Sequence, residues 1–393
     1  MNLYFFTEAR FDRVDNIIWT TPGFSMMLWQ RYLDKFEHVF VVARVDVVRT
    51  HSNDNIVELL SDRVTVVELP YYIGMAGYLK SRRAIKKIIS NLAHHGDAFL
   101  CRVPGNIGTL AADVLNKRDI PYSLEVVGDP WESMSKEAYG SLWSPMLQRI
   151  SRSQLRHVVK NASAALYVTE YTLQKEYPVS EGVFTTGASN VVLKDDCYSK
   201  QPRQTCINMK KRPVKLLSVG TLAQLYKAPD VVIKAMVLLK YKRYNVRLTW
   251  FGDGQFREPM KKLALELGVS DCVNFAGAVS QSVIRKEFEN TDLFVHASRA
   301  EGLPRAVIEA MAFGLPCIGS SVAGIPELLD KEAIVSPNDA KGLADKISHF
   351  IDDSDYMQQQ AERNWKEAKK YHNDILSARR KIFFDEIIKV SQI

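Results

Sequence analysis

The chain has 393 residues, of which 46% are hydrophobic and 25% are charged, and its formal net charge is +7 at pH 7. This length suits two domains, each large enough to bury its own core, and the composition excludes a chain dominated by disorder. The excess of positive charge favours anionic partners, such as a nucleoside diphosphate or an anionic membrane surface.

Several classes of protein do not fit the sequence. No apolar run reaches the roughly 18 to 20 residues of a membrane span, and the first residues lack the features of a signal peptide. The five cysteines are scattered without a C-x-x-C pair, which indicates reduced thiols and argues against a cysteine-bound metal. No motif of a nucleic-acid-binding module is present. We therefore expect a cytoplasmic protein with no metal site and no nucleic-acid partner.

Short apolar runs alternate with helical patterns in the first half of the chain, which predicts strand–helix units around a parallel sheet. Strands are expected at residues 2–6, 39–44, 64–69, 98–101, 122–127 and 164–168, and helices at 26–35, 78–92 and 147–162. The helix over 78–92 combines an apolar stripe with a basic face. That face fits either a solvated surface or contact with anionic lipid.

Polar residues accompany these strands near their carboxyl ends, where α/β folds bind ligands. Gly23 precedes the first helix, Arg102 follows the strand at 98–101, and Asp129 follows the strand at 122–127, which contains Glu125. The two carboxylates are candidates for a general base, and Arg102 is a candidate to bind a substrate. A turn or N-cap role for Asp129, next to Pro130, is equally consistent with the sequence.

A polar segment at residues 194–213, with two prolines and little periodicity, is the expected linker between domains at 1–193 and 214–374. The second domain has apolar runs typical of strands at 214–219, 247–252, 273–277 and 293–297. A final helix is expected at 375–390.

The stretch from 299 to 327 has the chemistry of an anion site. A strand ends before Glu301 and Gly302, a helix can begin at Pro304, and Gly314 ends that helix, so the segment is part of a βαβ unit. The backbone amides of 302–305 would cluster at the helix N-terminus, which suits a phosphate. Glu301 and Glu309 can accept hydrogen bonds from hydroxyl groups on either side of it. A nucleotide sugar has this arrangement.

At these residues the sequence resembles the retaining GT-B glycosyltransferases of family 4, the glycosyl transferases group 1, whose signature is two glutamates separated by seven residues. Further segments match in the family's order, at 251–254, 273–277, 292–298 and 324–327. The resemblance runs from about residue 216 to residue 329. It implies a GT-B fold, in which two Rossmann-like domains face each other across a cleft and a C-terminal helix, here 375–393, crosses back to the first domain.

The resemblance implies roles for individual residues. In the family the first glutamate binds the donor hexose, the second binds the ribose, and a lysine matching Lys227 binds the diphosphate. The catalytic candidates are accordingly Glu301, Lys227 and Asp129. The donor-binding candidates are Gly220, Lys227, Gly252, Val279, Gly302, Leu303, Pro304, Arg305 and Glu309. The acceptor-side candidates are Gly23, Arg102, Glu125 and Asp129.

Two positions depart from the family pattern. Thr221 stands where the family has an arginine that binds the diphosphate, and Arg102 or Arg299 is a candidate to replace it. Gly128 stands where many members have a histidine near the donor sugar. The acceptor proton then goes to Asp129 or Glu125, or to an oxygen of the leaving phosphate.

The implied reaction moves a hexosyl unit from a UDP- or GDP-linked sugar to a hydroxyl of a saccharide or lipid-linked saccharide, with retention of configuration. The implied setting is synthesis of a surface polysaccharide, such as capsule or O-antigen, and no cofactor is implied. The enzyme would work in the cytoplasm, with peripheral contact at the inner membrane surface. Two alternatives stay open: a catalytically silent nucleotide-sugar-binding assembly subunit, and a GT-B epimerase or phosphorylase.

Overall fold

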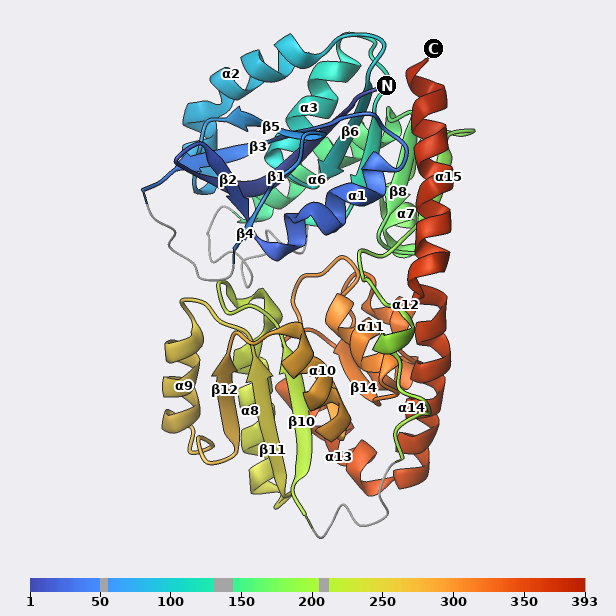
Figure 1. Ribbon diagram of the computed structural model, residues 1–393. Helices are drawn as coiled ribbons and strands as arrows, with labels where there is room; N and C mark the ends of the chain where they lie inside the picture. Colours follow the sequence, from blue (N-terminus) through green and yellow to red (C-terminus); the bar gives the residue numbers. More distant parts are fainter. Residues whose placement is uncertain (50–55, 131–143, 205–211, 393) are drawn as a thin grey trace. The chain divides into compact units, whose positions relative to one another are not determined.

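The computed structural model of the protein describes residues 1–49, 56–130, 144–204 and 212–392 (Figure 1). The chain divides into two compact units. The first contains Met1–Gly128, Ser151–Ala188 and Ser377–Ile393, and the second contains Asp129–Ile150 and Ser189–Leu376. We expected residues 129–150 in the first domain, whereas they are grouped with the second unit, and 131–143 lie outside the described residues.

The first unit is built on a mainly parallel sheet with nine strands in the described residues. The parallel strands follow the order β5, β3, β1, β6, β7, β8, β9, and β2 pairs antiparallel with β1 and β4. The strands are β1 (Leu3–Val14), β2 (Ile17–Thr20), β3 (Val39–Val47), β4 (Val57–Glu58), β5 (Val64–Leu69), β6 (Ala98–Val103), β7 (Ser123–Val126), β8 (Ala164–Tyr167) and β9 (Phe184–Gly187).

Helices of the first unit lie against this sheet, and most of the buried side chains of its strands are Val, Leu, Ile, Phe and Ala. Such near-continuous apolar strands are expected where both faces of a parallel sheet are covered (Figure 1). The helices are η1 (Pro22–Phe24), α1 (Met26–Leu33), α2 (Gly74–Leu92), α3 (Asn106–Asn116), α6 (Ser144–Lys160), α7 (Thr172–Glu176) and α15 (Asn373–Ser391).

The second unit has a six-stranded sheet in which every described pairing is parallel, in the order β12, β11, β10, β13, β14, β15. This is the doubly wound Rossmann order, in which consecutive crossovers reverse direction between the first and fourth strands. The strands are β10 (Val214–Val219), β11 (Val246–Phe251), β12 (Val273–Gly277), β13 (Leu293–His296), β14 (Cys317–Ser320) and β15 (Ile334–Val335).

Crossover helices connect these strands and complete the second unit (Figure 1). The helical segments are η2 (Asp195–Cys197), η4 (Leu225–Lys227), α8 (Pro229–Tyr241), α9 (Arg257–Glu266), α10 (Gln281–Asn290), α11 (Arg305–Ala312), α12 (Ile325–Leu328), η5 (Lys331–Ala333), α13 (Ala340–Asp352), α14 (Ser354–Ala368) and η6 (Lys369–Tyr371). The two Rossmann-like units confirm the fold class expected from the sequence.

The C-terminal helix α15 returns to the first unit, as expected. Its residue Phe384 is buried and packs against Tyr32, with ring centroids 5.1 Å apart, and against Phe36 at 6.1 Å. On the same helix Arg379 donates a hydrogen bond to the carbonyl of Gly187 at 2.9 Å. The apolar packing and this polar contact together hold the helix to the first unit.

The segment that we expected to link the two domains is partly attached to the second unit. The amide of Ser199 donates to the carbonyl of Ala312 at 3.1 Å, and the amide of Arg203 donates to Gly314 at the same distance. Residues 205–211 lie outside the described residues. The described part of 194–213 therefore runs along the second unit, because backbone hydrogen bonds bind it to the end of α11.

Candidate functional site

The second unit presents a ligand site at the edge of its sheet where β10 and β13 lie side by side. The order of the strands reverses here, and doubly wound sheets bind ligands beyond the carboxyl ends of such strands. Gly220 follows β10, and Ser298 and Glu301 follow β13. The loops of both strands thus end at one place.

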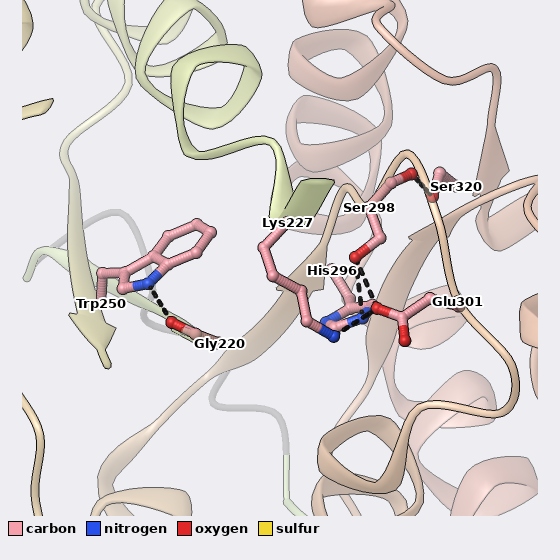
Figure 2. A network of polar contacts seen from close by, with 7 residues as sticks. All are labelled: Gly220, Lys227, Trp250, His296, Ser298, Glu301 and Ser320. Carbon is pink, nitrogen blue, oxygen red and sulfur yellow. Dashed lines mark hydrogen bonds and ion pairs between the residues drawn. The ribbon is translucent and has the colours of Figure 1, made fainter. Parts of the chain in front are cut away.

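Three side chains contact a single carboxylate oxygen, Oε1 of Glu301, at this edge of the sheet. Oε1 of Glu301 accepts hydrogen bonds from Nε2 of His296 at 2.7 Å and from Oγ of Ser298 at 2.6 Å, and Nζ of Lys227 contacts the same oxygen. Figure 2 shows the three side chains pointing toward Glu301 from different segments of the unit. Lys227 ends η4, His296 ends β13, and Ser298 lies in the following loop. All four side chains are largely buried.

The charges of this cluster are set by burial and by pairing. Burial alone would raise the pKa of Glu301, but the Lys227 ammonium and the hydrogen bonds of the cluster lower it to well below the usual range. Burial lowers the pKa of His296, although Glu301 opposes this effect. These pKa shifts favour an ionised carboxylate at Glu301 and a neutral imidazole at His296.

Two predicted glycines make room for this cluster. The side chain of Lys227 passes so close to Gly220 that a β-carbon there would come within 2.9 Å of its Cγ. Gly252, after β11, has a φ of +141° and would place a β-carbon 1.9 Å from the carbonyl oxygen of Gly220, which accepts a hydrogen bond from Trp250 Nε1 at 2.9 Å. Close backbone approach and the positive φ require glycine at 252, whereas a β-carbon at 220 would require the side chain of Lys227 to shift.

The loop before α11 leaves several of its backbone amides without a partner in the described chain. Throughout the described chain, no protein group accepts a hydrogen bond from the backbone amides of Gly302, Leu303 or Arg305. The carbonyl of Gly302 accepts from the amide of Gly324 at 2.9 Å, which ties the loop to the segment before α12. The arrangement leaves donors at a helix N-terminus next to Glu301, as required for a phosphate.

Glu309 lies on α11, one turn beyond the loop. Its Oε1 accepts a hydrogen bond from Gln281 Nε2 at 3.4 Å, and burial raises its pKa although Arg305 and Arg285 oppose the shift. A small pocket adjoins the carboxylate. Its lining residues are Leu193, Cys197, Gln281, Ile284, Arg285, Phe288, Glu309 and Phe313. The apolar part of this wall limits hydration of Glu309, which agrees with the raised pKa.

The remaining predicted donor residues flank this region. Val279 is half-buried between β12 and α10. Leu303 and Pro304 are buried, whereas Arg305, the first residue of α11, is exposed. The structure thus brings Gly220, Lys227, Gly252, Glu301 and the loop together within the second unit, and leaves the binding role of each as a prediction.

Arg299, a sequence candidate to replace the missing arginine, has a different task. Its guanidinium binds both carboxylate oxygens of Asp230 at 2.9 and 2.8 Å, and its Nε donates to Asn338 at 2.6 Å. The hydroxyl of Thr221 accepts from the amide of Ala223 at 3.1 Å. Both residues stabilise loops next to the site, and neither offers an uncommitted charge to a ligand.

Three of the acceptor-side candidates, Gly23, Arg102 and Glu125, lie in the first unit, and Arg102 and Glu125 share one cluster. Nε of Arg102 lies 3.4 Å from Oε2 of Glu125, and the hydroxyl of Tyr32 donates to Oε1 of the same carboxylate. The guanidinium of Arg102 lies 5.7 Å from the ring of Phe24, the residue that follows Gly23. Only 3% of Glu125 is exposed, so its pairing favours a structural role over that of a base.

Asp129 is half-buried just beyond β7, and it has a polar or electrostatic partner within the chain. It is grouped with the second unit, whereas its neighbour Gly128 closes a segment of the first. A role as base, a turn role and an N-cap role all stay predictions for this residue.

The sequence analysis missed two members of the donor-side cluster. His296 and Ser298 were part of a matched segment but were given no role. The signal was the apolar strand ending in two polar residues, which at the carboxyl end of a parallel strand face the ligand edge of the sheet. The contact with Glu301 itself depends on how the loop folds back.

Comparison with known proteins identifies the second unit. The family model described as Glycosyl transferases group 1 matches residues 202–370. Protein CapJ of Staphylococcus aureus is 28% identical over 352 residues, which cover 89% of this chain and 86% of that protein. The amylovoran biosynthesis glycosyltransferase AmsK of Erwinia amylovora is 32% identical over 142 residues, 34% of this chain and 35% of AmsK.

The fold has a solved counterpart in HepE of Anabaena, whose crystal structure contains UDP and glucose. The two chains superpose with a TM-score of 0.62 at 16% identity, covering 97% of each. A likeness at this identity shows the fold, and it confirms the GT-B architecture expected from the sequence. Among the described residues, no helix is both long and apolar enough to cross a bilayer.

Proposed function

This chain is a glycosyltransferase whose residues 202–370 match the glycosyl transferases group 1 family. From this premise we propose a specific reaction. The enzyme moves a hexosyl unit from a nucleoside diphosphate sugar to a hydroxyl group of a saccharide or lipid-linked saccharide, and it retains the anomeric configuration. The observation that carries the proposal is the convergence of Lys227 and Glu301 beside the backbone amides of Gly302, Leu303 and Arg305, which have no acceptor in the described chain.

The donor would bind along this edge of the sheet. The amides of Gly302, Leu303 and Arg305 would donate to the diphosphate, with Lys227 as the cation. Glu301 would accept hydrogen bonds from the hexose hydroxyls, and Glu309 from the ribose. HepE, which contains UDP and glucose, supports a nucleotide sugar as the donor. A UDP- or GDP-linked sugar is our expectation.

Catalysis would come from stabilising the leaving group. Negative charge builds up on the diphosphate as the glycosidic bond breaks, so donors that bind it most strongly at that point accelerate the reaction. Lys227 and the loop amides lie beside Glu301, and we expect them to be these donors. The proposed reaction uses these groups and requires no metal or other cofactor.

Retention places the acceptor on the face from which the diphosphate leaves. The acceptor hydroxyl can then give its proton to a phosphate oxygen, or to Asp129. The buried pairing of Glu125 with Tyr32 and Arg102 favours these two recipients over Glu125. The anionic diphosphate oxygen is the simpler recipient because it gains charge as the bond breaks.

The acceptor is proposed to be a growing surface polysaccharide such as capsule or O-antigen. AmsK, a glycosyltransferase of amylovoran biosynthesis, supports this class, and so does the putative colanic acid biosynthesis glycosyltransferase WcaL of Escherichia coli. Each of these relatives matches about a third of the chain.

A lipid-linked acceptor would bring the enzyme to the cytoplasmic face of the membrane. Helix α2 supports this location, because its basic residues Lys80, Arg82, Arg83, Lys86 and Lys87 are exposed together with Leu79, of which 62% is accessible. A basic helix face with exposed apolar side chains suits an anionic lipid surface.

Release of nucleoside diphosphate tests the reaction. The protein would be incubated with UDP-, GDP-, ADP- and dTDP-hexoses, with and without short saccharides or extracted membrane lipids. We expect release from one nucleotide series, stimulated by an acceptor, and a fall of about a hundredfold or more in Lys227→Met. Lys240→Met is the control, since Lys240 pairs with Asp271 on the surface.

The outcomes separate the competing functions. A product with the donor's anomeric configuration supports retention, and an inverted product contradicts it. Nucleotide-sugar binding without release, under every acceptor condition, would favour the catalytically silent binding subunit. Acceptor-independent conversion of the sugar would favour an epimerase, and phosphate-dependent conversion a phosphorylase.

A further inference from the structure

The imidazole of His296 and the hydroxyl of Ser298 hold Glu301 independently of Lys227. His296 is the last residue of β13 and 4% exposed, and Ser298 is completely buried. Their donors lie 2.7 and 2.6 Å from Oε1 of Glu301. The carbonyl of Ser298 accepts in turn from Oγ of Ser320 on β14 at 2.6 Å (Figure 2). These two donors are therefore anchored on two neighbouring strands of the sheet.

Lys227 is attached differently. It ends the short η4 segment, and its long side chain reaches Glu301 past Gly220. A lysine ammonium on a flexible stem can shift between acceptors, whereas a buried imidazole at the end of a strand cannot. The cluster thus combines one movable charged donor with two fixed neutral ones.

The proposed function gives Lys227 a second acceptor, the donor diphosphate. If Lys227 were the sole partner of Glu301, its move would leave a buried carboxylate unpaired, which is costly. The two fixed donors remove most of that cost because hydrogen bonds to the ionised form stabilise it in place. Neutral imidazole can make this contact only with the proton on Nε2.

We propose that His296 and Ser298 are positioning residues, which fix the Glu301 carboxylate toward the donor sugar and leave Lys227 available for the diphosphate. The inference rests on the proposed function and adds two residues to it. It predicts that loss of the imidazole donor weakens recognition of the sugar and leaves recognition of the diphosphate intact.

Binding measurements on matched variants test this division. Titration calorimetry would compare UDP, GDP, ADP and dTDP with their hexose conjugates. For the nucleotide that wild type prefers, His296→Leu should weaken binding of the sugar conjugate by about tenfold or more. Binding of the nucleoside diphosphate itself should change by less than about twofold. His296→Gln, which keeps a donor near Nε2, should restore most of the loss.

The control variant is Ser218→Ala. Ser218 is buried in β10 and donates to the carbonyl of Val295 at 2.8 Å, so the substitution removes a comparable hydrogen bond of the same sheet without touching Glu301. It should weaken neither ligand selectively, whereas Ser298→Ala should behave as His296→Leu does. Melting temperatures identify any variant that fails to fold.

A second measurement does not depend on a folded variant or on a ligand. Long-range nitrogen–proton NMR of wild type at about pH 7.5 should show one buried histidine as the neutral Nε2–H tautomer, which a charged imidazolium would contradict. Equal weakening of both ligands in His296→Leu, or no rescue by His296→Gln, overturns the inference. Failure of wild type to bind any nucleotide sugar overturns the donor assignment itself, and this inference with it.

Discussion

The two glutamates of the proposed donor site, Glu301 and Glu309, have opposite electrostatic environments. Glu301 accepts hydrogen bonds from His296 and Ser298 and forms an ion pair with Lys227. Its pKa is lowered despite its burial. Glu309 is desolvated with one weak hydrogen bond from Gln281, and its pKa is raised. A carboxylate that lacks sufficient partners in the free protein can gain them from a ligand, and ribose hydroxyls would supply them.

Glu309 should therefore reduce the stability of the free protein at neutral pH. A pKa raised on folding means that ionisation opposes folding, so stability is lost as the pH rises from about 4.3 through the raised folded value. Glu309→Gln should raise the melting temperature by roughly one to three degrees near pH 7.5. The gain should vanish as the pH is lowered toward about 4.

Calorimetric melting across this pH range checks the prediction. Glu266→Gln, on the exposed surface of α9, is the control and should have no comparable effect. A destabilised Glu309→Gln protein near pH 7.5 would show that Glu309 has strong partners in the free protein, contrary to our account.

At the residue scale the sequence predicted part of the site and could not predict the rest. Glu301, Glu309 and Lys227 lie in motifs with fixed spacing, so a single sequence reveals them. The commitment of Arg299 to Asp230, 69 residues away, has no local signal. The convergence of His296 and Ser298 on Glu301 depends on the path of the loop, which sequence spacing does not specify.

At the scale of elements, the junction of β10 and β11 positions the donor site through close backbone contact. The amide of Gly252 donates to the carbonyl of Gly277 at 2.9 Å, and Gly254 has a φ of +148°. Side chains are excluded where these loops meet the segment after Gly220. The glycines that looked like weak signals in the sequence are steric requirements.

Gly252→Ala should destabilise the second unit by about 3 kcal/mol or more, because the new β-carbon meets the carbonyl oxygen of Gly220 and φ is unfavourable. Gly268→Ala is the matched control. Its φ is +69° and a β-carbon there would have no other atom within 4 Å, so the substitution should cost only about 1 kcal/mol. Denaturant unfolding measures both, and equal costs would contradict the close approach.

Most elements matched the sequence pattern, and the exceptions have identifiable causes. The strands at 64–69, 214–219 and 273–277 occur as expected, because short runs rich in apolar and β-branched residues favour strands. The β1–β2 hairpin was missed although Asp15 and Asn16 have φ values of 48° and 68°. Such a two-residue turn favours these residue types, but the polar residues Arg10, Asp12 and Arg13 in the strand before it hide the pattern.

At the scale of the whole molecule, the excess of positive charge can serve two kinds of anionic partner, a diphosphate and an anionic lipid surface. The proposed donor site would use Lys227 for the diphosphate, and α2 presents a separate exposed group of basic residues on the first unit. The general bias is visible in the composition. Which basic residues lie near the proposed phosphate site and which lie on an exposed helix face can be read only from the fold.

Lys86→Gln/Lys87→Gln should weaken binding to phosphatidylglycerol vesicles by about tenfold at low salt, since each basic residue near an anionic surface contributes about 1 kcal/mol. Cosedimentation measures this binding. The control is Lys261→Gln/Lys262→Gln, an adjacent pair on α9. Equal effects of the two variants, or binding that is insensitive to salt, would contradict a specific role for α2.

The measurement that tests the central claim most directly is thermal stabilisation of wild type, Glu309→Ala and the surface control Glu266→Ala by UDP-, GDP-, ADP- and dTDP-sugars. A ligand that binds the folded state raises its melting temperature. We predict that one nucleotide series stabilises wild type and Glu266→Ala, and that this stabilisation is lost in Glu309→Ala. Stabilisation that is indifferent to Glu309, or absent for every nucleotide sugar, would contradict the donor site.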